Sequence, residues 1–104
     1  LMRLAPDDLD QLLQQYDRDH QHPLNRRLHL VGITLIGAAS LTVWFLPPLA
    51  LTLFAAGWSA QLLGHAVEGK PPSFSRDRRF LVVGAVWYAR ELRALVSRSL
   101  SARV

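Results

Sequence analysis

The residues of this chain whose types and spacing could do chemistry are its four histidines and one carboxylate. They are His20, His22, His29, His65 and Glu68. His29 and His65 lie near the two ends of residues 28–67, a segment without Asp, Glu, Lys or Arg that Pro47-Pro48 interrupts at its middle. A hairpin folded at these prolines would bring both imidazoles to one end. Neutral imidazoles with one carboxylate suit iron(II) and leave positions open for oxygen and substrate.

Polar residues at helical spacing extend this pattern. Asn25 and His29 are four apart, and Gln61, His65 and Glu68 are separated by four and then three positions, so each set shares a helix face. Ionisable groups in apolar surroundings tend to be functional. The simpler interpretations are a hydrogen-bonding role for His29, a helix cap at His22 and a solvated Glu68. The convergence of several such residues favours a metal or catalytic site.

Four helices are predicted to position these side chains. Residues 6–18 carry leucines at helical spacing, and residues 23–45 and 49–68 are apolar and long enough to cross a bilayer. Residues 78–99 combine a short apolar run with arginines, which is typical of an amphipathic helix at a membrane surface. The predicted fold class is all-α: one membrane domain over residues 1–104, a transmembrane helical hairpin with flanking amphipathic helices. A water-soluble helical bundle is the alternative.

The charge distribution predicts the orientation in the membrane. The net charge is +4, and the twelve Lys and Arg fall on both sides of the hairpin but not in its turn. The positive-inside tendency then places both termini in the cytoplasm, in an integral membrane protein of the inner membrane if the source is bacterial. Aspartates at positions 7, 8 and 10 do not suit a signal peptide, so we expect the first hairpin helix to direct insertion.

The amino-acid composition also excludes several kinds of site and partner. The chain has no cysteine, which excludes disulfides, iron–sulfur clusters and zinc–thiolate sites. The arginines flank apolar segments and do not gather on one face, so no nucleic-acid partner is expected. The expected partner is the lipid bilayer. Two helices bury little surface, which makes a homo-oligomer plausible.

Two separated motifs resemble a known family. Tyr16, His20, Asn25 and His29 in the run YDRDHQHPLNRRLHLVG, followed by Trp58, Gln61 and Gly64-His65 in GWSAQLLGHAVEGKPP, are similar to the 2-hydroxy fatty acid dioxygenase family of small membrane proteins. The family pattern is a tyrosine and a histidine before Asn-x-x-x-His, then Gln-Phe-x-Gly-His-x-x-Phe-Glu and a basic, proline-containing stretch. The resemblance covers about residues 16–73.

This resemblance implies an iron(II)-dependent α-oxidation, in which a long-chain 2-hydroxy fatty acid and dioxygen give an acid one carbon shorter. The implied metal ligands are His20, His29 and His65, with His22 ranked below them. The implied catalytic residues are Asn25, Gln61 and Glu68. Arg26 or Arg27 would offer a cation to the substrate carboxylate.

The chain departs from the family pattern after Gly64-His65. It reads Ala-Val-Glu, one residue short of the family spacing, and the phenylalanine is missing. Two other functions are therefore kept as alternatives. One is a haem protein with His29 and His65 as axial ligands. The other is a small membrane adaptor without chemistry, whose polar residues only hold helices together.

Overall fold

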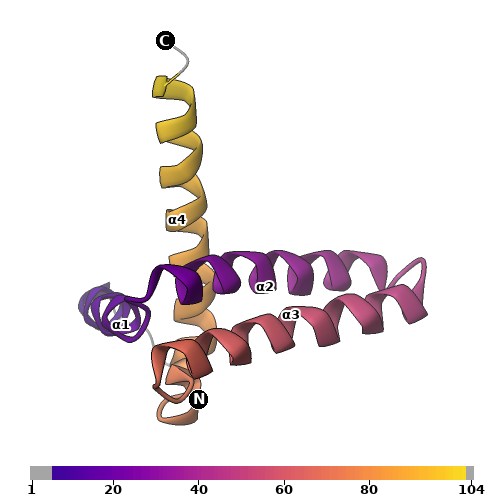
Figure 1. The fold of residues 1–104 in the computed structure, drawn as a ribbon, viewed down its shortest axis with the longest axis horizontal. Coiled ribbons are helices and arrows are strands. Elements are labelled where there is room, and N and C mark those ends of the chain that lie inside the picture. Colours follow the sequence, from indigo (N-terminus) through magenta and orange to yellow (C-terminus); the bar gives the residue numbers. More distant parts are fainter. Residues whose placement is uncertain (1–5, 103–104) are drawn as a thin grey trace. The chain divides into compact units, whose positions relative to one another are not determined.

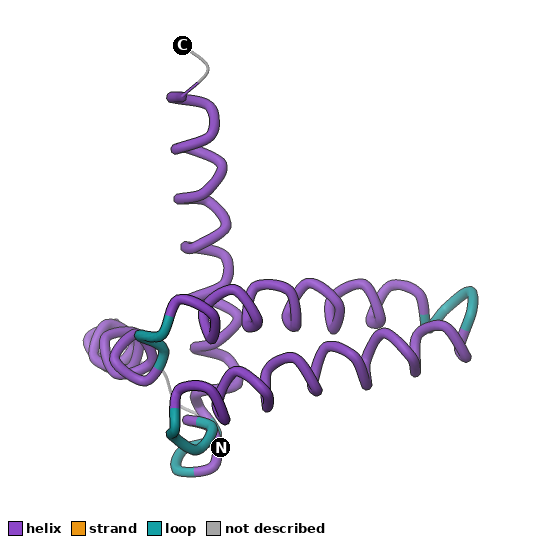
Figure 2. The backbone as a smooth tube through the Cα atoms, viewed as in Figure 1, coloured by secondary structure: helices purple, strands orange, loops and turns teal. Residues whose placement is uncertain are grey.

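The computed structural model describes residues 6–102, and within this range it is helical and has no strand (Figures 1 and 2). The helices are α1 (Pro6–Asp19), α2 (Pro23–Thr42), α3 (Pro47–Glu68), the short 3-10 helix η1 (Ser73–Ser75) and α4 (Arg79–Ala102). The predicted all-α class is therefore confirmed. The described residues group into two compact units, one of residues 19–72 and one of residues 6–18 with 73–102. Residues 1–5 and 103–104 of the predicted domain lie outside the described part, and the single-domain prediction remains a prediction.

Helices α2 and α3 form an antiparallel hairpin (Figure 1). Their backbones approach most closely at a pair of facing glycines. A Cβ atom added at Gly32 would lie 2.6 Å from the carbonyl oxygen of Gly57, and one added at Gly57 would lie 2.6 Å from that of Gly32. Both positions therefore require glycine, since any side chain there would push the helices apart. This contact fixes the relative register of the residues further along both helices.

The turn of the hairpin lies slightly before the predicted position. Helix α2 ends at Thr42, whose carbonyl accepts hydrogen bonds from the N–H groups of Phe45 and Leu46 at 2.9 and 2.8 Å. Pro47 and Pro48 are the first residues of α3 and not the turn itself. Proline suits this place because the first turn of a helix needs no amide donor and proline already has a helical φ. The chain thus uses the two prolines to start the return helix.

The opposite end of the hairpin is closed by two caps. The Nδ1 atom of His22 accepts a hydrogen bond from the N–H of Leu24 at 3.1 Å, which makes His22 the N-cap of α2. At the end of α3, Gly69 adopts a left-handed φ of 77° and its N–H donates to the carbonyl of His65 at 2.9 Å. Both caps lie close in sequence to candidate site residues. The same local backbone structure that ends the helices therefore also positions the candidate site residues.

The second compact unit contains most of α1, together with η1 and α4. Its aromatic core is formed by Tyr16 from α1 and Phe80 and Trp87 from α4, with ring centroids of Tyr16 6.3 and 5.3 Å from those of the other two. A Cβ atom at Gly84 would lie 3.0 Å from the Tyr16 hydroxyl oxygen, so the glycine makes room for the ring. The indole N–H of Trp87 donates to Asp17 at 3.4 Å. These contacts bury the apolar face of α1 against α4.

The predicted hairpin helices are present, but their interpretation as membrane-spanning helices is not supported. Among the described residues, no helix combines the length with the sustained hydropathy needed to cross a bilayer. The physical reason lies in the composition of the two helices. Asn25, Arg26 and Arg27 occupy the first turns of α2, and Gln61 and His65 interrupt the last turns of α3. The apolar character is therefore concentrated toward the turn.

Candidate metal centre

Three histidines meet at the end of the hairpin away from its turn, and we call His20, His29 and His65 the histidine cluster. His29 Nε2 lies 3.1 Å from Nε2 of His20 and 3.1 Å from Nε2 of His65. The three rings are packed edge to face, with centroids 4.3 to 4.9 Å apart. His20 and His29 are essentially inaccessible to solvent, and His65 is 7% exposed. One ligand atom from each residue lies within 4.8 Å of the others, so all three could bind one ion.

A different element supplies each ring. His20 follows the last residue of α1, His29 lies in the second turn of α2, and His65 lies in the last turn of α3. The guanidinium of Arg26 holds the segment that carries His20, because its Nη1 donates to the carbonyl of His20 at 2.9 Å. The hairpin register brings His29 and His65 to the same end, as their equal distances from the prolines suggest.

The hydrogen bonding of His29 fixes which of its nitrogens can bind a metal. Its Nδ1 lies 3.0 Å from the carbonyl oxygen of Asn25, which can only accept a hydrogen bond. Nδ1 therefore carries the proton, and in the neutral ring Nε2 has a free lone pair directed at the other two histidines. A hydrogen bond from the non-ligating nitrogen to a carbonyl is how metal-binding histidines are usually oriented.

Burial keeps His29 and His65 neutral. Desolvation and, next in size, the charge of the neighbouring His20 together lower the pKa of His29 to about 3. Burial also lowers the pKa of His65 to about 4, again with a contribution from His20. Both rings are thus deprotonated at neutral pH, the form in which imidazole binds metals. A proton does not compete with a cation for these nitrogens near pH 7.

The two distances that involve His29 also suit a common ion. Two nitrogens bound about 2.1 Å from one ion at right angles to each other are about 3.0 Å apart. This value is close to the 3.1 Å between Nε2 of His29 and each neighbour. Three imidazole nitrogens from three elements, without a thiolate, form a donor set that could bind a divalent transition metal, iron(II) among them.

Asn25 and Glu68 form a polar clamp beside the cluster. Glu68 Oε1 accepts hydrogen bonds from the backbone N–H of His22 at 2.7 Å and from Nδ2 of Asn25 at 3.1 Å. Desolvation raises the pKa of the Glu68 carboxyl, but the two hydrogen bonds, the charge of Lys70 and a backbone hydrogen bond from Gln21 together bring the pKa below its ordinary value. The clamp joins the end of α3 to the start of α2, and so holds the residue whose carbonyl orients His29.

Gly64 provides the space that the clamp needs. A Cβ atom there would collide with Oδ1 of Asn25 and would lie 3.3 Å from Nδ1 of His29. Asn25 is fully buried, and its Oδ1 has no hydrogen-bond partner among the described residues; the same is true of Nδ1 of His65. Two buried polar atoms without partners are costly to folding, which is typical of functional sites and not of a core built for stability.

The remaining sequence-predicted residues lie around the cluster without being part of it. His22 caps α2, which was the simpler interpretation of this residue. The Cγ atom of Gln61 packs over Gly32, one turn before His65. Arg26 lies beside His20, and Arg27 is exposed. Their assigned roles stay predictions.

Sequence reasoning missed Asp19, the last residue of α1. Its side chain is 4% exposed, and its negative charge raises the pKa of His65 against the effect of burial. It therefore places a buried negative charge near the cluster, where it would also favour a bound cation. The signal in the sequence was its position directly before His20, but an aspartate at a helix end is most often solvated.

Comparisons with known proteins identify the family. No curated protein and no solved structure matched the chain. A family described as 2-hydroxy-palmitic acid dioxygenase Mpo1-like matches residues 7–96, which include all three histidines of the cluster as well as Asn25 and Glu68. Because this match covers most of the sequence, the chain belongs to the Mpo1-like family.

Proposed function

We propose that this protein is an iron(II)-dependent dioxygenase that shortens long-chain 2-hydroxy fatty acids by one carbon. The observation that carries the proposal is the buried cluster of three imidazoles, in which Nε2 of His29 lies 3.1 Å from Nε2 of His20 and 3.1 Å from Nε2 of His65. The family name supplies the class of substrate and reaction.

In this proposal His20, His29 and His65 hold the iron, and the iron supplies the activation of dioxygen that side chains alone cannot provide. The protein's own contribution is to keep His29 and His65 neutral, to orient His29 through the carbonyl of Asn25, and to keep water away from the buried rings. Glu68 acts through Asn25 as a positioning residue. Three protein ligands leave room for dioxygen and substrate at the same ion.

The overall reaction balances with one dioxygen for each 2-hydroxy acid. The bond between carbons 1 and 2 breaks, carbon 2 becomes the new carboxyl carbon, and the products are the shorter acid, carbon dioxide and water. Arg26 provides a positive charge for the substrate carboxylate, since its guanidinium already lies beside His20. Arg27, one residue further along the helix and exposed, is the second candidate for this contact.

We propose further that the apolar end of the hairpin lies in a lipid bilayer, with both chain ends on the cytoplasmic side. Large apolar side chains around the turn are strongly exposed, among them Leu41 (73%), Trp44 (82%) and Phe45 (80%). Such a surface is costly in water and favourable in lipid. Insertion of the turn region needs no complete crossing by either helix. It would place the histidine cluster near the headgroups, where a fatty acid presents its carboxylate.

The direct experiment is to incubate the purified protein with iron(II) and 2-hydroxypalmitic acid under air, and to identify products by mass spectrometry. The proposal expects pentadecanoic acid in amounts that depend on iron and oxygen. A variant with His65→Ala should form none. Wild-type protein that binds iron but leaves the acid unchanged would contradict the proposed reaction.

The geometry argues against the haem alternative. A haem held by His29 and His65 would have to lie between their two rings. Nε2 of His29 and Nε2 of His65 are 3.1 Å apart, with His20 packed against both rings. An adaptor without chemistry would give protein that binds no metal, which the same experiment measures.

A further inference from the structure

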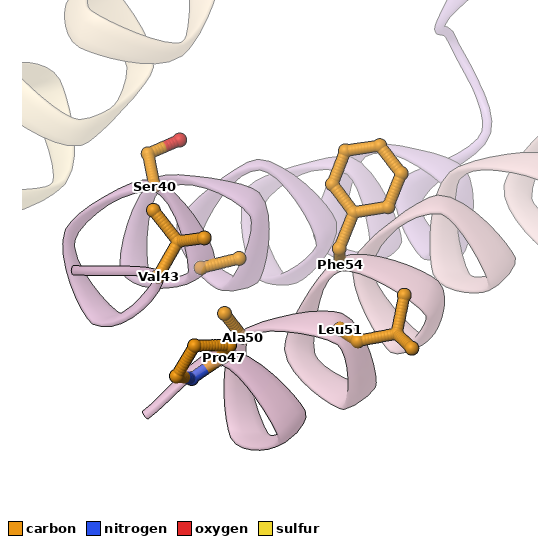
Figure 3. A pocket seen from close by; sticks show the side chains of 7 residues that line it. Ser40, Val43, Pro47, Ala50, Leu51 and Phe54 are labelled. Atoms are coloured by element: carbon orange, nitrogen blue, oxygen red, sulfur yellow. The ribbon is translucent and has the colours of Figure 1, made fainter. Parts of the chain in front are cut away.

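An apolar groove lies between the two hairpin helices near the turn (Figure 3). Its volume is about 430 Å³. We call it the tip groove, and its lining residues are Ala39, Ser40, Val43, Pro47, Ala50, Leu51 and Phe54. In Figure 3, Ser40 comes from α2 and Val43 directly follows this helix, and Phe54 and Leu51 come from α3. The groove lies at the opposite end of the hairpin from the histidine cluster.

A stripe of side chains on α3 connects the tip groove with the cluster. At 100° per residue, Phe54, Trp58 and Gln61 share one helix face with His65, and we call these three residues the track. The rings of Phe54 and Trp58 are in contact, with centroids 6.4 Å apart. The side chain of Gln61 crosses the interface between α3 and α2 and lies against Gly32 of α2. On α2, Ser40 and His29 likewise share a face. The groove and the cluster therefore lie on the same face of the two helices.

The length of this path matches a long fatty acyl chain. At 1.5 Å per residue, Phe54 lies about 16 Å from His65 along α3, and Ala50 lies about 22 Å from it. A zigzag hydrocarbon chain advances about 1.25 Å per carbon, so carbons 2 to 16 of an extended palmitoyl chain cover about 18 Å. With carbon 2 at the cluster, the methyl end of a sixteen-carbon acid reaches the tip groove. A ten-carbon acid would end on the track.

We propose that the track and the tip groove hold the acyl chain of the substrate, and that the groove sets the preferred chain length. This inference rests on the proposed function, because it takes the histidine cluster as the place where carbon 2 reacts. The occupant is a single extended hydrocarbon chain with its carboxylate beside Arg26. The apolar lining of the groove and the two aromatic rings of the track provide contacts that each added methylene would gain.

The test fills the groove without entering the helix interface. Ser40 is exposed, lines the groove and donates its hydroxyl to the carbonyl of Ile36. Thr34 is exposed about 120° around the same helix from Ser40, does not line the groove, and donates its hydroxyl to the carbonyl of Leu30. Ser40→Phe and Thr34→Phe are thus a matched pair: both lose a hydroxyl bond of the same kind and gain the same apolar ring.

The quantity to measure is the ratio of kcat/KM for the sixteen-carbon to that for the ten-carbon 2-hydroxy acid. Ser40→Phe should lower this ratio about tenfold, which corresponds to about two methylenes displaced from the groove. Thr34→Phe should keep the ratio within twofold of wild type. Equal ratios in the two variants would overturn the chain-length role. If the wild-type protein converts neither acid, the proposed function is wrong. A measurement of fatty-acid binding then tests separately whether the acyl chain lies along the track and in the tip groove.

Binding is measured on the same protein by tryptophan fluorescence. Trp58 lies about 10 Å along α3 from His65, so a 2-hydroxy acid brominated near its ninth and tenth carbons would place the quencher beside this ring. Saturable quenching should persist in Trp44→Phe, whose side chain lies on the turn outside the groove, and disappear in Trp58→Phe. Saturable quenching that survives in Trp58→Phe would place the chain elsewhere and refute the path.

Discussion

The two ends of the hairpin reverse the usual rule of burial. At the cluster end, the polar side chains of Asn25, His20 and His29 are at most 1% exposed. At the turn end, Trp44 and Phe45 are at least 80% exposed. Burying polar groups lowers stability, and two buried atoms of the described residues, Oδ1 of Asn25 and Nδ1 of His65, have no hydrogen-bond partner. Exposing aromatic rings to water also lowers stability. Neither feature increases the stability of the fold. The buried end instead provides nitrogen donors that water does not reach, and the turn end provides an exposed apolar surface.

The largest expected effect comes from removing a ring of the cluster. His29→Ala should lower the iron(II) affinity by more than about a hundredfold, because the central nitrogen of the three is lost. Metal content of the purified variant, measured by mass spectrometry, checks this. His22→Ala is the matched control: it removes a helix cap, costs about 1 kcal/mol of stability and should keep its iron. Equal loss of iron in the two variants would contradict the assignment of the iron site to the histidine cluster.

The next effect concerns the glycines of the hairpin. Gly64→Ala should lower the free energy of unfolding by about 2–3 kcal/mol, since its methyl group collides with the clamped amide of Asn25. Gly37→Ala provides the contrast, because a Cβ there meets nothing within 4 Å and should stabilise the helix by about 0.5–1 kcal/mol. Chemical denaturation measures both. The site geometry would be wrong if Gly64→Ala behaved like Gly37→Ala.

Because of the histidine cluster, the free energy of unfolding of the metal-free protein should also decrease at acidic pH. The folded-state pKa values of His29 and His65 are about 3 and about 4, below the ordinary value of 6.5. The unfolded chain therefore binds protons first as the pH falls. Stability from these groups is complete above about pH 6.5 and is lost as the pH falls toward 4, by at most about 2 kcal/mol per histidine at pH 5.

Denaturation curves at pH 7 and pH 5 check this dependence. His65→Gln removes one of the titrating rings and should flatten the change between the two pH values. A wild-type stability that stays constant from pH 7 to pH 5 would show that the rings are not held neutral by burial. The turn end of the hairpin has no titrating group and should contribute nothing to the slope.

The smallest effect is expected at the clamp. Glu68→Gln keeps the shape of the side chain but weakens its hydrogen bonds to the N–H of His22 and to Nδ2 of Asn25. We expect a loss of about 1 kcal/mol and an iron affinity lowered about tenfold, with His29 still bound. Isothermal titration with iron(II) under anaerobic conditions measures the affinity. A complete loss of iron would instead make Glu68 a ligand.

The sequence alone predicted the helices well because their ends carry strong local signals. Pro6, Pro23 and Gly69 begin or end helices where expected, and the facing of His29 and His65 follows from their spacing about the prolines. The turn was misplaced, since proline is compatible both with a turn and with the first residues of a helix. Beyond this meeting of His29 and His65, periodicity within single helices did not identify the hydrogen bonds that join the segments.

The contacts between segments determine how the residues of the candidate site are positioned. The hydrogen bonds of Glu68 depend on where the start of α2 lies, and the capping role of His22 depends on a backbone conformation that no residue pattern specifies. The burial of Asp19 was unpredictable because it follows from tertiary packing. The apolar composition of the hairpin was visible in the sequence, but its interpretation as two complete membrane crossings is not supported by the hydropathy of the helices.

X-ray absorption spectroscopy of the iron(II)-loaded protein tests the central claim most directly. The account predicts scattering from three imidazole rings around the iron, reduced to two in His20→Ala. A spectrum without imidazole scattering, or one that His20→Ala, His29→Ala and His65→Ala all leave unchanged, would contradict it.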